Sequence, residues 1–172
     1  MKIRPPGRQT QRSPDLSPDR SGEDRGFAIG VVSLGVGDLL VADRFYREGF
    51  GLVHARPPQA VIYFELPGTM LALCRRDELA RYAGLPSSPS PQENSKEDSK
   101  HPKSAPFGGI TLSCNVASRS EVEARCARAE RAGGRILRGP HDEQWGGYCA
   151  WIADPDHHLW EVVWNPRWFG ER

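Results

Sequence analysis

The same order of predicted elements occurs twice in the sequence, and this duplication constrains the fold more than any other feature. In each half a strand runs into the N-cap of a helix, at residues 36–38 in the first half and at residues 116–118 in the second. Later in each half a turn runs into a last strand, at residues 67–72 and at residues 156–161. Such a repeat predicts two copies of one structural unit. Because each copy has an apolar sheet face too large to leave in water, we expect the copies to pack around one shared core.

Each half is predicted to contain a strand, a helix and three further strands, from runs of β-branched and aromatic residues bounded by turn signals. Asp38 and Ser118 are the expected N-caps, and Glu121 completes a capping box with Ser118. In the first half we predict strands at residues 29–36, 52–56, 60–66 and 70–74, and helices at residues 39–48 and 77–83. In the second half we predict strands at residues 109–116, 135–141, 148–153 and 159–164, and a helix that Gly133-Gly134 closes.

Two segments have compositions that do not support packing. Residues 1–26 are rich in Arg, Pro, Ser, Asp and Gly, and residues 86–106 in Ser, Pro, Lys, Glu and Asn. Such segments bury too little apolar surface to offset chain entropy, so we predict a disordered N-terminal tail and a flexible linker, with a charged regulatory segment as the alternative for the linker. The expected organisation is one domain at residues 27–166, with module one at residues 27–85, module two at residues 107–166, and a C-terminal tail at residues 167–172.

Composition argues against several classes of protein. The formal net charge of +1 gives no reason to expect binding to nucleic acid or to an anionic membrane. No apolar run is long enough to span a bilayer, and the N-terminus lacks the apolar core of a signal peptide. The four cysteines are scattered in apolar surroundings without a CxxC pair, which favours buried free thiols in a reducing cytosol. We therefore expect a cytoplasmic protein.

Glu161 stands out because it lies in the middle of an apolar strand. Residues 148–153 and 159–164 form a predicted hairpin around the turn at residues 154–156. A carboxylate in such a strand is costly unless it is paired, ligates an ion or faces a wet cavity. The sequence leaves three roles open for Glu161: a ligand anchor, a general base with a raised pKa, or a structural carboxylate beside an arginine.

Other side chains are candidates for a ligand site. Polar residues alternate with apolar ones on the first and fifth strands and should face one concavity; they are Ser33, Thr111, Ser113 and Asn115. Trp145 and Tyr148 flank two glycines, where their rings either stack on a planar ligand or only cover the core. We expect the remaining tryptophans of the last two strands in the core under the helices, namely Trp151, Trp160 and Trp164. Four histidines are conceivable metal ligands, although surface or turn positions explain them more simply: His54, His141, His157 and His158.

Five stretches of the sequence resemble the vicinal oxygen chelate superfamily, the group of glyoxalase I, bleomycin-resistance proteins, fosfomycin-resistance enzymes and extradiol dioxygenases. They are residues 32–39 (VSLGVGDL), Phe45-Tyr46, residues 49–52 (GFGL), Trp145-Gly146 and residues 154–162 (DPDHHLWEV). The last is the most specific, because it is similar to the family's D-P-D-G-x-x-W-E signature. The resemblance implies an α+β fold of two βαβββ modules, whose eight strands form a cupped, open barrel with the helices outside. It also implies a ligand in the cup and pairing into homodimers.

The resemblance also implies where a metal would lie. In metal-using members, side chains from the first and last strand of each module hold a divalent ion, and the corresponding positions here are Val31, Ala72, Thr111 and Glu161. Val31 and Ala72 have no donor atom and Thr111 is a weak ligand, whereas the family metals are bound by imidazole and carboxylate together. We therefore expect no metal and no cofactor. His157 replaces the glycine of the signature, so it should adopt a positive φ.

The leading hypothesis is a metal-free glyoxalase/bleomycin-resistance-like protein that binds a small organic molecule in the cup, with Glu161 as its candidate catalytic residue. The first alternative is an enzyme, a divalent-metal-dependent lyase or isomerase in which Glu161, water and a misplaced histidine hold the ion. The second alternative is a protein-partner binding module that uses the tail and the linker. We expect a homodimer in each case.

Overall fold

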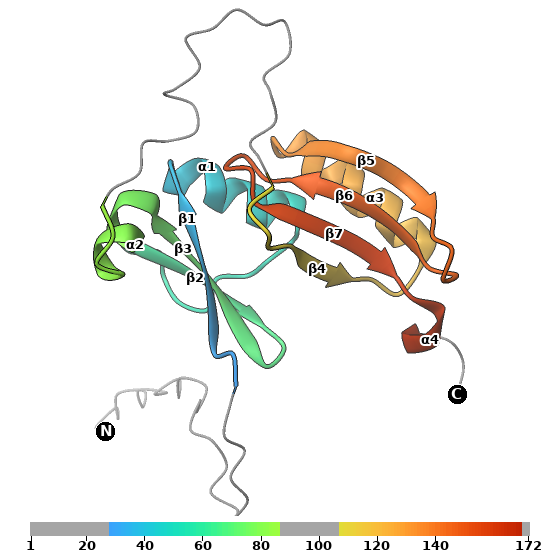
Figure 1. Cartoon of the computed structure of the whole chain (residues 1–172), viewed down its shortest axis with the longest axis horizontal. Coiled ribbons are helices and arrows are strands. Elements are labelled where there is room, and N and C mark those ends of the chain that lie inside the picture. Colours follow the sequence, from blue (N-terminus) through green and yellow to red (C-terminus); the bar gives the residue numbers. More distant parts are fainter. Residues whose placement is uncertain (1–27, 87–106, 170–172) are drawn as a thin grey trace, which may run out of the picture.

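The computed structural model describes residues 28–86 and 107–169, which form two units of helices and strands side by side (Figure 1). The tail predicted at residues 1–26, the linker predicted at residues 86–106 apart from Pro86, and residues 170–172 lie outside the described residues. Within the described part of the chain, no helix is both long enough and apolar enough to cross a bilayer.

The first unit contains three strands, two short helices and one π-helical segment. In chain order they are β1 (Val31–Val36), α1 (Leu39–Arg44), η1 (Phe45–Gly49), β2 (Val61–Leu66), β3 (Thr69–Arg75) and α2 (Arg76–Tyr82). The strand order in the sheet is β1-β3-β2, with β1 parallel and β2 antiparallel to β3. The predicted helix at residues 39–48 is therefore present, but its second half has π-helical hydrogen bonding.

The second unit contains four strands, one long helix and a short helix near the C-terminus. In chain order they are β4 (Leu112–Asn115), α3 (Arg119–Arg131), β5 (Arg135–Asp142), β6 (Tyr148–Ala153), β7 (Leu159–Trp164) and α4 (Pro166–Phe169). The strand order is β4-β7-β6-β5, with β4 parallel to β7 and the other pairs antiparallel. β6 and β7 have the bounds that the sequence predicted, and α4 occupies the start of the predicted C-terminal tail.

The helix caps form as the local sequence predicts. The Asp38 carboxylate accepts hydrogen bonds from the backbone N–H groups of Leu40 and Val41, at 2.8 and 3.2 Å. The Ser118 hydroxyl accepts from the N–H of Glu121 at 3.2 Å, and the Glu121 carboxylate accepts from the N–H of Ala117 at 2.8 Å. These side chains satisfy N–H groups that have no partner within their own helix. In both modules, the start of the helix is therefore determined by side chains within a few residues of it.

The prediction of an eight-stranded barrel is wrong in two respects. The described residues contain seven strands in separate sheets of three and four, and these sheets are not closed into a barrel. The strand predicted at residues 52–56 is reduced to an isolated bridge between His54 and Phe64. Pro57 and Pro58 follow directly, and proline has no backbone N–H to donate to a strand ladder. What remains is an α+β fold of two βαβββ-like modules.

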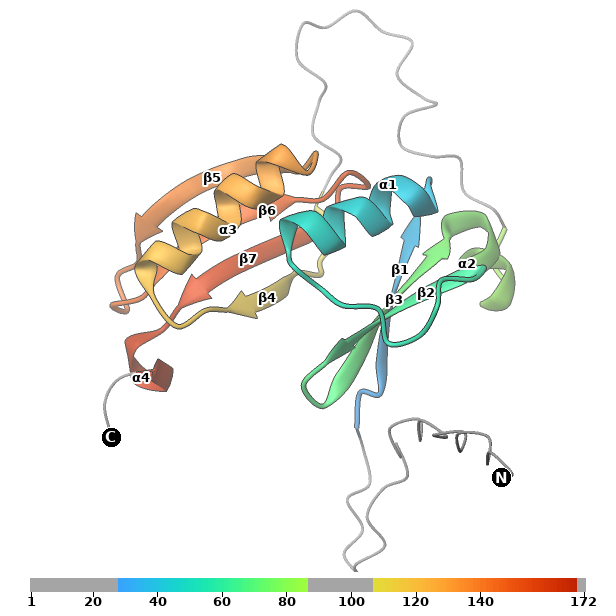
Figure 2. The ribbon, with the colours of Figure 1, turned by 180° about the vertical axis from the view of Figure 1, so that it is seen from behind.

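The core lies where the helices of the two units meet each other and their sheets, and Figure 2 shows α1 and α3 on the same side of the molecule. Phe50 packs on Trp160 of the other unit, with ring centroids 4.8 Å apart. Gly49 brings the backbones close, because a Cβ there would lie 3.1 Å from the Cα of Ala129 on α3. The largest fully buried side chains come from both units: Tyr46, Phe45, Phe64, Leu71, Leu73, Ile152, Val36, Val122 and Val162.

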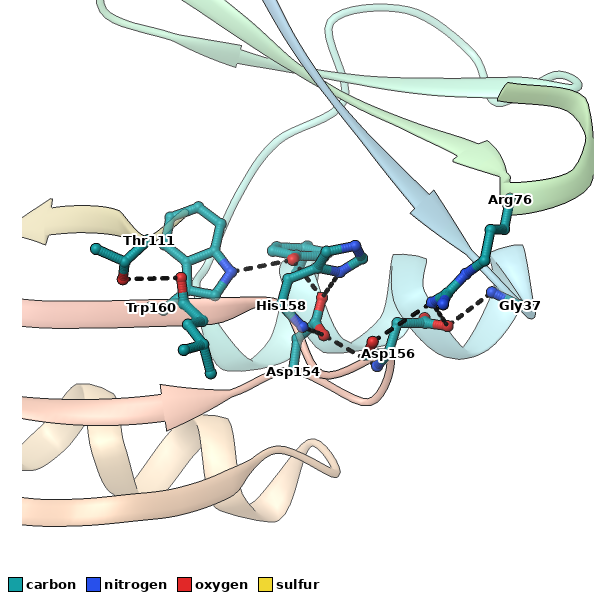
Figure 3. Close-up of polar contacts among 9 residues, drawn as sticks. Gly37, Arg76, Thr111, Asp154, Asp156, His158 and Trp160 are labelled. Carbon is teal, nitrogen blue, oxygen red and sulfur yellow. Dashed lines mark hydrogen bonds and ion pairs between the residues drawn. The ribbon is translucent and has the colours of Figure 1, made fainter. Parts of the chain in front are cut away.

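The turn between β6 and β7 is organised by the buried carboxylate of Asp154 (Figure 3). Its Oδ1 accepts hydrogen bonds from the backbone N–H groups of Asp156 and His158, at 2.9 and 2.7 Å. Its Oδ2 accepts from the Tyr46 hydroxyl at 2.6 Å and lies 2.9 Å from Nδ1 of His158. The Tyr46 hydroxyl in turn accepts from Nε1 of Trp160 at 3.1 Å. Burial, reinforced by the charge of Asp154, raises the pKa of Tyr46 well above its usual range.

The second aspartate of the turn binds the first unit. Oδ1 of Asp156 accepts from the backbone N–H of Gly37 at 2.7 Å and lies 3.5 Å from the Arg76 guanidinium (Figure 3). Burial raises the pKa of Asp156, and the hydrogen bond from Gly37 opposes that rise. His157, between the two contacts, has a φ of 69°, which confirms the prediction of a left-handed residue at this position. Asp154 and Asp156 therefore fix the two units to each other.

Replacing Asp154 should destabilise the protein strongly. Asp154→Ala leaves the Tyr46 hydroxyl and two backbone N–H groups without their acceptor, so we expect the free energy of unfolding to fall by about 3 kcal/mol. Urea denaturation followed by far-ultraviolet circular dichroism measures it. Asp142→Ala is the matched control, because Asp142 is exposed and pairs only on the surface, with Arg119; it should cost less than about 1 kcal/mol. Equal losses in the two variants would contradict the structural role of Asp154.

Candidate functional site

The face of the four-stranded sheet opposite α3, called here the open face, carries a row of polar and aromatic side chains. The strand register aligns Ser113 on β4, Glu161 on β7, Trp151 on β6 and Arg138 on β5. Ser113 and Arg138 are exposed, while Glu161 and Trp151 are half-buried. Four strands thus contribute to a single row. In Figure 1 the sheet lies in front of α3, so its open face is toward the viewer.

The alternation of β7 explains why Glu161 lies on this face. Trp160 and Val162 are buried in the core on the α3 side, so Glu161 between them points the other way. The Ser113 hydroxyl donates a hydrogen bond to Oε2 of Glu161 at 2.6 Å. This bond holds the carboxylate in place and leaves its other oxygen available to a ligand.

The next row on the open face brings together a thiol, an imidazole and a carboxylate. Cys149 on β6 pairs in register with His141 on β5, and Glu143 follows His141 by two residues. Nε2 of His141 lies 2.8 Å from Oε1 of Glu143 and 3.7 Å from Sγ of Cys149. Sγ of Cys149 donates to the same Oε1 at 3.6 Å. Burial, followed by the charges of Glu143 and Glu161, raises the pKa of Cys149 to about 12.

A tight turn fixes the position of Glu143. Its backbone N–H donates to the carbonyl of Gly147, and its carbonyl accepts from the N–H of Gly146, both at 2.9 Å. Gly146 has a φ of 93°, a conformation that L side chains rarely adopt. The ring of Trp145 lies against Gly147, where any side chain would clash with it. The glycine pair beside Trp145 is therefore required by the turn and by this ring.

The structure separates the residues that the sequence proposed as a ligand site. Ser113 and Asn115 lie on the open face in register with Glu161 and Val163. Thr111 lies just before β4, and its hydroxyl donates to the carbonyl of Leu159 at 3.2 Å. Ser33 lies in the other sheet, where it is exposed and pairs with Ala72.

The two aromatic candidates, Trp145 and Tyr148, also lie in different places. Tyr148 lies on the α3 side, where its hydroxyl donates to Glu123 at 3.1 Å and the Arg119 guanidinium stacks 4.6 Å from its ring centroid. Trp145 is exposed in the β5–β6 turn. The expectation that Trp151 belongs to the core under the helices is wrong, because it shares the strand face of Cys149 rather than that of Ile152. Trp160 and Trp164 do pack against the core.

The positions at which the superfamily binds metal do not fit an ion here. Val31 and Ala72 have no donor atoms, and Ala72 is buried. The Thr111 hydroxyl is engaged by a carbonyl, and Glu161 by Ser113. One carboxylate and one neutral hydroxyl do not make the imidazole-and-carboxylate set that such ions require.

The remaining histidines have structural partners or lie in turns. Nε2 of His54 lies 2.5 Å from Oδ1 of Asp43, which also pairs with Arg47 at 3.0 Å. His158 is bound to Asp154, and His157 is exposed in the turn. Among the described histidines, His141 is the one that meets both a carboxylate and a thiol.

Sequence reasoning did not find the cluster of His141, Glu143 and Cys149. His141 and Glu143 are two residues apart and therefore share a strand face, which was a usable signal. The pairing of His141 with Cys149 was not readable, because β5 has register shifts between Ile136 and His141 that depend on its partner strand.

The comparisons with known proteins agree with this architecture. The family model of the Glyoxalase/Bleomycin resistance protein/Dioxygenase superfamily matches residues 28–162. A glyoxalase-related enzyme from Fulvimarina pelagi is 31% identical, with a TM-score of 0.67 over 80% of this chain and 88% of that one. A lactoylglutathione lyase from Agrobacterium tumefaciens is 26% identical, with a TM-score of 0.52 over 82% of this chain and 96% of that one. No curated protein matches significantly.

The two-module fold defines the class, a glyoxalase-like protein of βαβββ modules. The chain belongs to the Glyoxalase/Bleomycin resistance protein/Dioxygenase superfamily. The resemblance seen in the sequence is thereby confirmed. A family enzyme from Burkholderia phytofirmans, 16% identical with a TM-score of 0.61 over 80% of this chain and 98% of that one, supports the fold alone.

The raised pKa of Cys149 predicts a loss of stability at alkaline pH. The pKa of this thiol is about 12 in the folded protein against an ordinary value of 9.0. The unfolded state therefore loses its proton first, and the stabilising contribution, complete below pH 9, disappears as pH rises from 9 toward 12. Urea denaturation across this range should show a steeper decline for the wild type than for Cys149→Ala. Parallel declines in the two proteins would show that Cys149 does not titrate in this way.

Proposed function

We propose that the open face binds a small polar organic molecule, without a metal at the superfamily's usual position. The observation that carries the proposal is the row of Ser113, Glu161, Trp151 and Arg138 across four strands. A half-buried indole flanked by a carboxylate and an exposed guanidinium offers stacking, an acceptor and a charged donor within one row. Binding sites in general combine apolar walls with a few polar groups of this kind.

The proposed roles follow from the chemistry of each side chain. Trp151 stacks on a planar part of the molecule, and Arg138 binds an oxyanion such as a carboxylate. Glu161 accepts a hydrogen bond from a ligand hydroxyl or amide, with its orientation set by Ser113. Asn115 lies two residues from Ser113 on β4, on the same face, and could contact a larger ligand. Homodimer formation, which superfamily membership suggests, is part of the proposal and is tested by light scattering.

The ring of Trp151 should contribute strongly to ligand affinity. A thermal-shift screen of carboxylated metabolites identifies a binder, because a ligand specific for the folded state raises the melting temperature. Trp151→Ala should then weaken that binder by about tenfold or more, since it removes a stacking surface. Trp168→Ala is the control, because Trp168 is exposed on α4, and it should leave the affinity unchanged. Equal affinities in Trp151→Ala and wild type would show that the ligand does not bind at the open face.

A second candidate function is that of a lyase or isomerase that uses a divalent ion at Glu161. The observation in its favour is that Glu161 lies on the same face as His141, the histidine of the cluster described above. Such an enzyme requires one ion per chain, bound through Glu161. Metal analysis of the purified protein tests this function, with Glu161→Gln as the variant. An ion lost in Glu161→Gln supports the enzyme, whereas an ion retained in that variant contradicts it.

A further inference from the structure

The cluster on β5 and β6 combines the three side-chain types that bind transition metals most often. Nε2 of His141, a carboxylate oxygen of Glu143 and Sγ of Cys149 all lie within 4.8 Å of one another. We propose that His141, Glu143 and Cys149 form a binding site for a divalent transition-metal ion of the zinc class. The site lies apart from the superfamily's metal position, which is on the first and last strands of the modules.

The distances between the donor atoms suit a tetrahedral ion. Bonds of about 2.3 Å to sulfur and about 2.0–2.1 Å to nitrogen and oxygen place tetrahedral ligands about 3.3–3.6 Å apart. The observed separations are 3.7 Å from Sγ to Nε2 and 3.6 Å from Sγ to Oε1. The separation of Nε2 and Oε1, 2.8 Å, has to open by about 0.5 Å. The side chains of His141 and Glu143 are partly exposed, at 18% and 26%, so this adjustment involves side chains that are not enclosed by the core.

The orientation of the His141 ring supports metal binding. Nδ1 lies 2.8 Å from the carbonyl oxygen of Gly139, and a carbonyl can only accept, so Nδ1 carries a hydrogen. The other nitrogen, Nε2, is the atom that faces Glu143 and Cys149. Metal-binding histidines characteristically donate one ring N–H to a carbonyl or carboxylate and bind the ion through the other nitrogen. An ion would bind the lone pair of Nε2, the ring nitrogen that Gly139 does not engage.

The charges also balance. A carboxylate and a thiolate together neutralise a divalent ion, and bound metal keeps a coordinating thiol deprotonated despite its burial. Glu161 adds negative charge on the same face. The Arg138 guanidinium, 3.6 Å from Oε1 of Glu143, competes with the ion for that oxygen. With three protein ligands, a fourth coordination position stays open to water or to a ligand oxygen.

A nucleophilic role for Cys149 fits the geometry less well. A Cys–His–acid relay needs the cysteine at one ring nitrogen of the histidine and the acid at the other. Here Glu143 and Cys149 both approach Nε2, while Nδ1 is bound to Gly139. Cys149 also has 0% of its surface exposed, which keeps it from a substrate carbon. An ion instead requires three donor atoms that face one point, and Nε2, the Glu143 carboxylate and Sγ have this arrangement.

Cobalt and zinc titrations of the full chain test the site. Co²⁺ should bind one equivalent and produce the near-ultraviolet charge-transfer absorption of a thiolate ligand, and Zn²⁺ should displace it. Cys149→Ala should abolish that absorption, and Glu143→Gln should weaken zinc binding by at least about tenfold. Cys114→Ala is the matched control, since Cys114 lies in the same sheet and its side chain packs against the core on the α3 side; its absorption should match the wild type.

Two further variants separate this site from its competitors. Arg138→Gln should tighten zinc binding by up to about fivefold, because it removes the cation that competes for Glu143. Glu161→Gln should retain one zinc per chain, whereas an ion at the superfamily's position would be lost. Circular dichroism checks that each variant folds. If Cys149→Ala does not fold, Glu143→Gln, at a partly exposed position, still tests the site. A thiolate absorption that survives in Cys149→Ala, or zinc binding unchanged in Glu143→Gln, overturns the proposal.

Discussion

The buried carboxylate of Asp154 is the interaction on which the arrangement of the two units depends. A buried charge is tolerated when hydrogen bonds replace its hydration, and this one accepts from two backbone N–H groups and the Tyr46 hydroxyl. The backbone bonds shape the turn, and the Tyr46 bond reaches the first unit. One residue therefore sets both the start of β7 and the packing of η1 against it. Asp156 strengthens the same junction through Gly37 and Arg76.

The position of β7 in turn divides the four-stranded sheet into a face that packs in the core and an open face that carries polar side chains. Trp160 and Val162 point into the core shared with the first unit, so Glu161 must point to the open face. The same alternation on β6 sends Ile152 inward and places Trp151 and the buried Cys149 on the other face of the sheet. The stabilising face and the proposed binding face are thus made by neighbouring residues of the same strands. A one-residue shift in register would exchange them.

Local sequence signals predicted the elements well where their causes are local. Asp38 and Ser118 cap the helices that follow them, and the turn after Asp154 holds His157 at a positive φ, because each depends on atoms within a few residues. The strand expected at residues 52–56 is only an isolated bridge, because the two prolines that follow limit its pairing. The barrel expected from the family resemblance did not form, and the described strands lie in two separate sheets instead.

The sequence by itself determined the duplicated α+β architecture, its family and the isolated carboxylate at Glu161, because apolar periodicity, capping residues and the D-P-D turn act over short distances. Only the tertiary structure decided which side chains meet. Ser113 reaches Glu161, Tyr148 turns away to Glu123, and His141 meets Cys149 through a strand register that contains shifts. Register is set by packing against partner strands rather than by the residues of one strand. That is why the sequence singled out Glu161 but not the thiol, imidazole and carboxylate beside it.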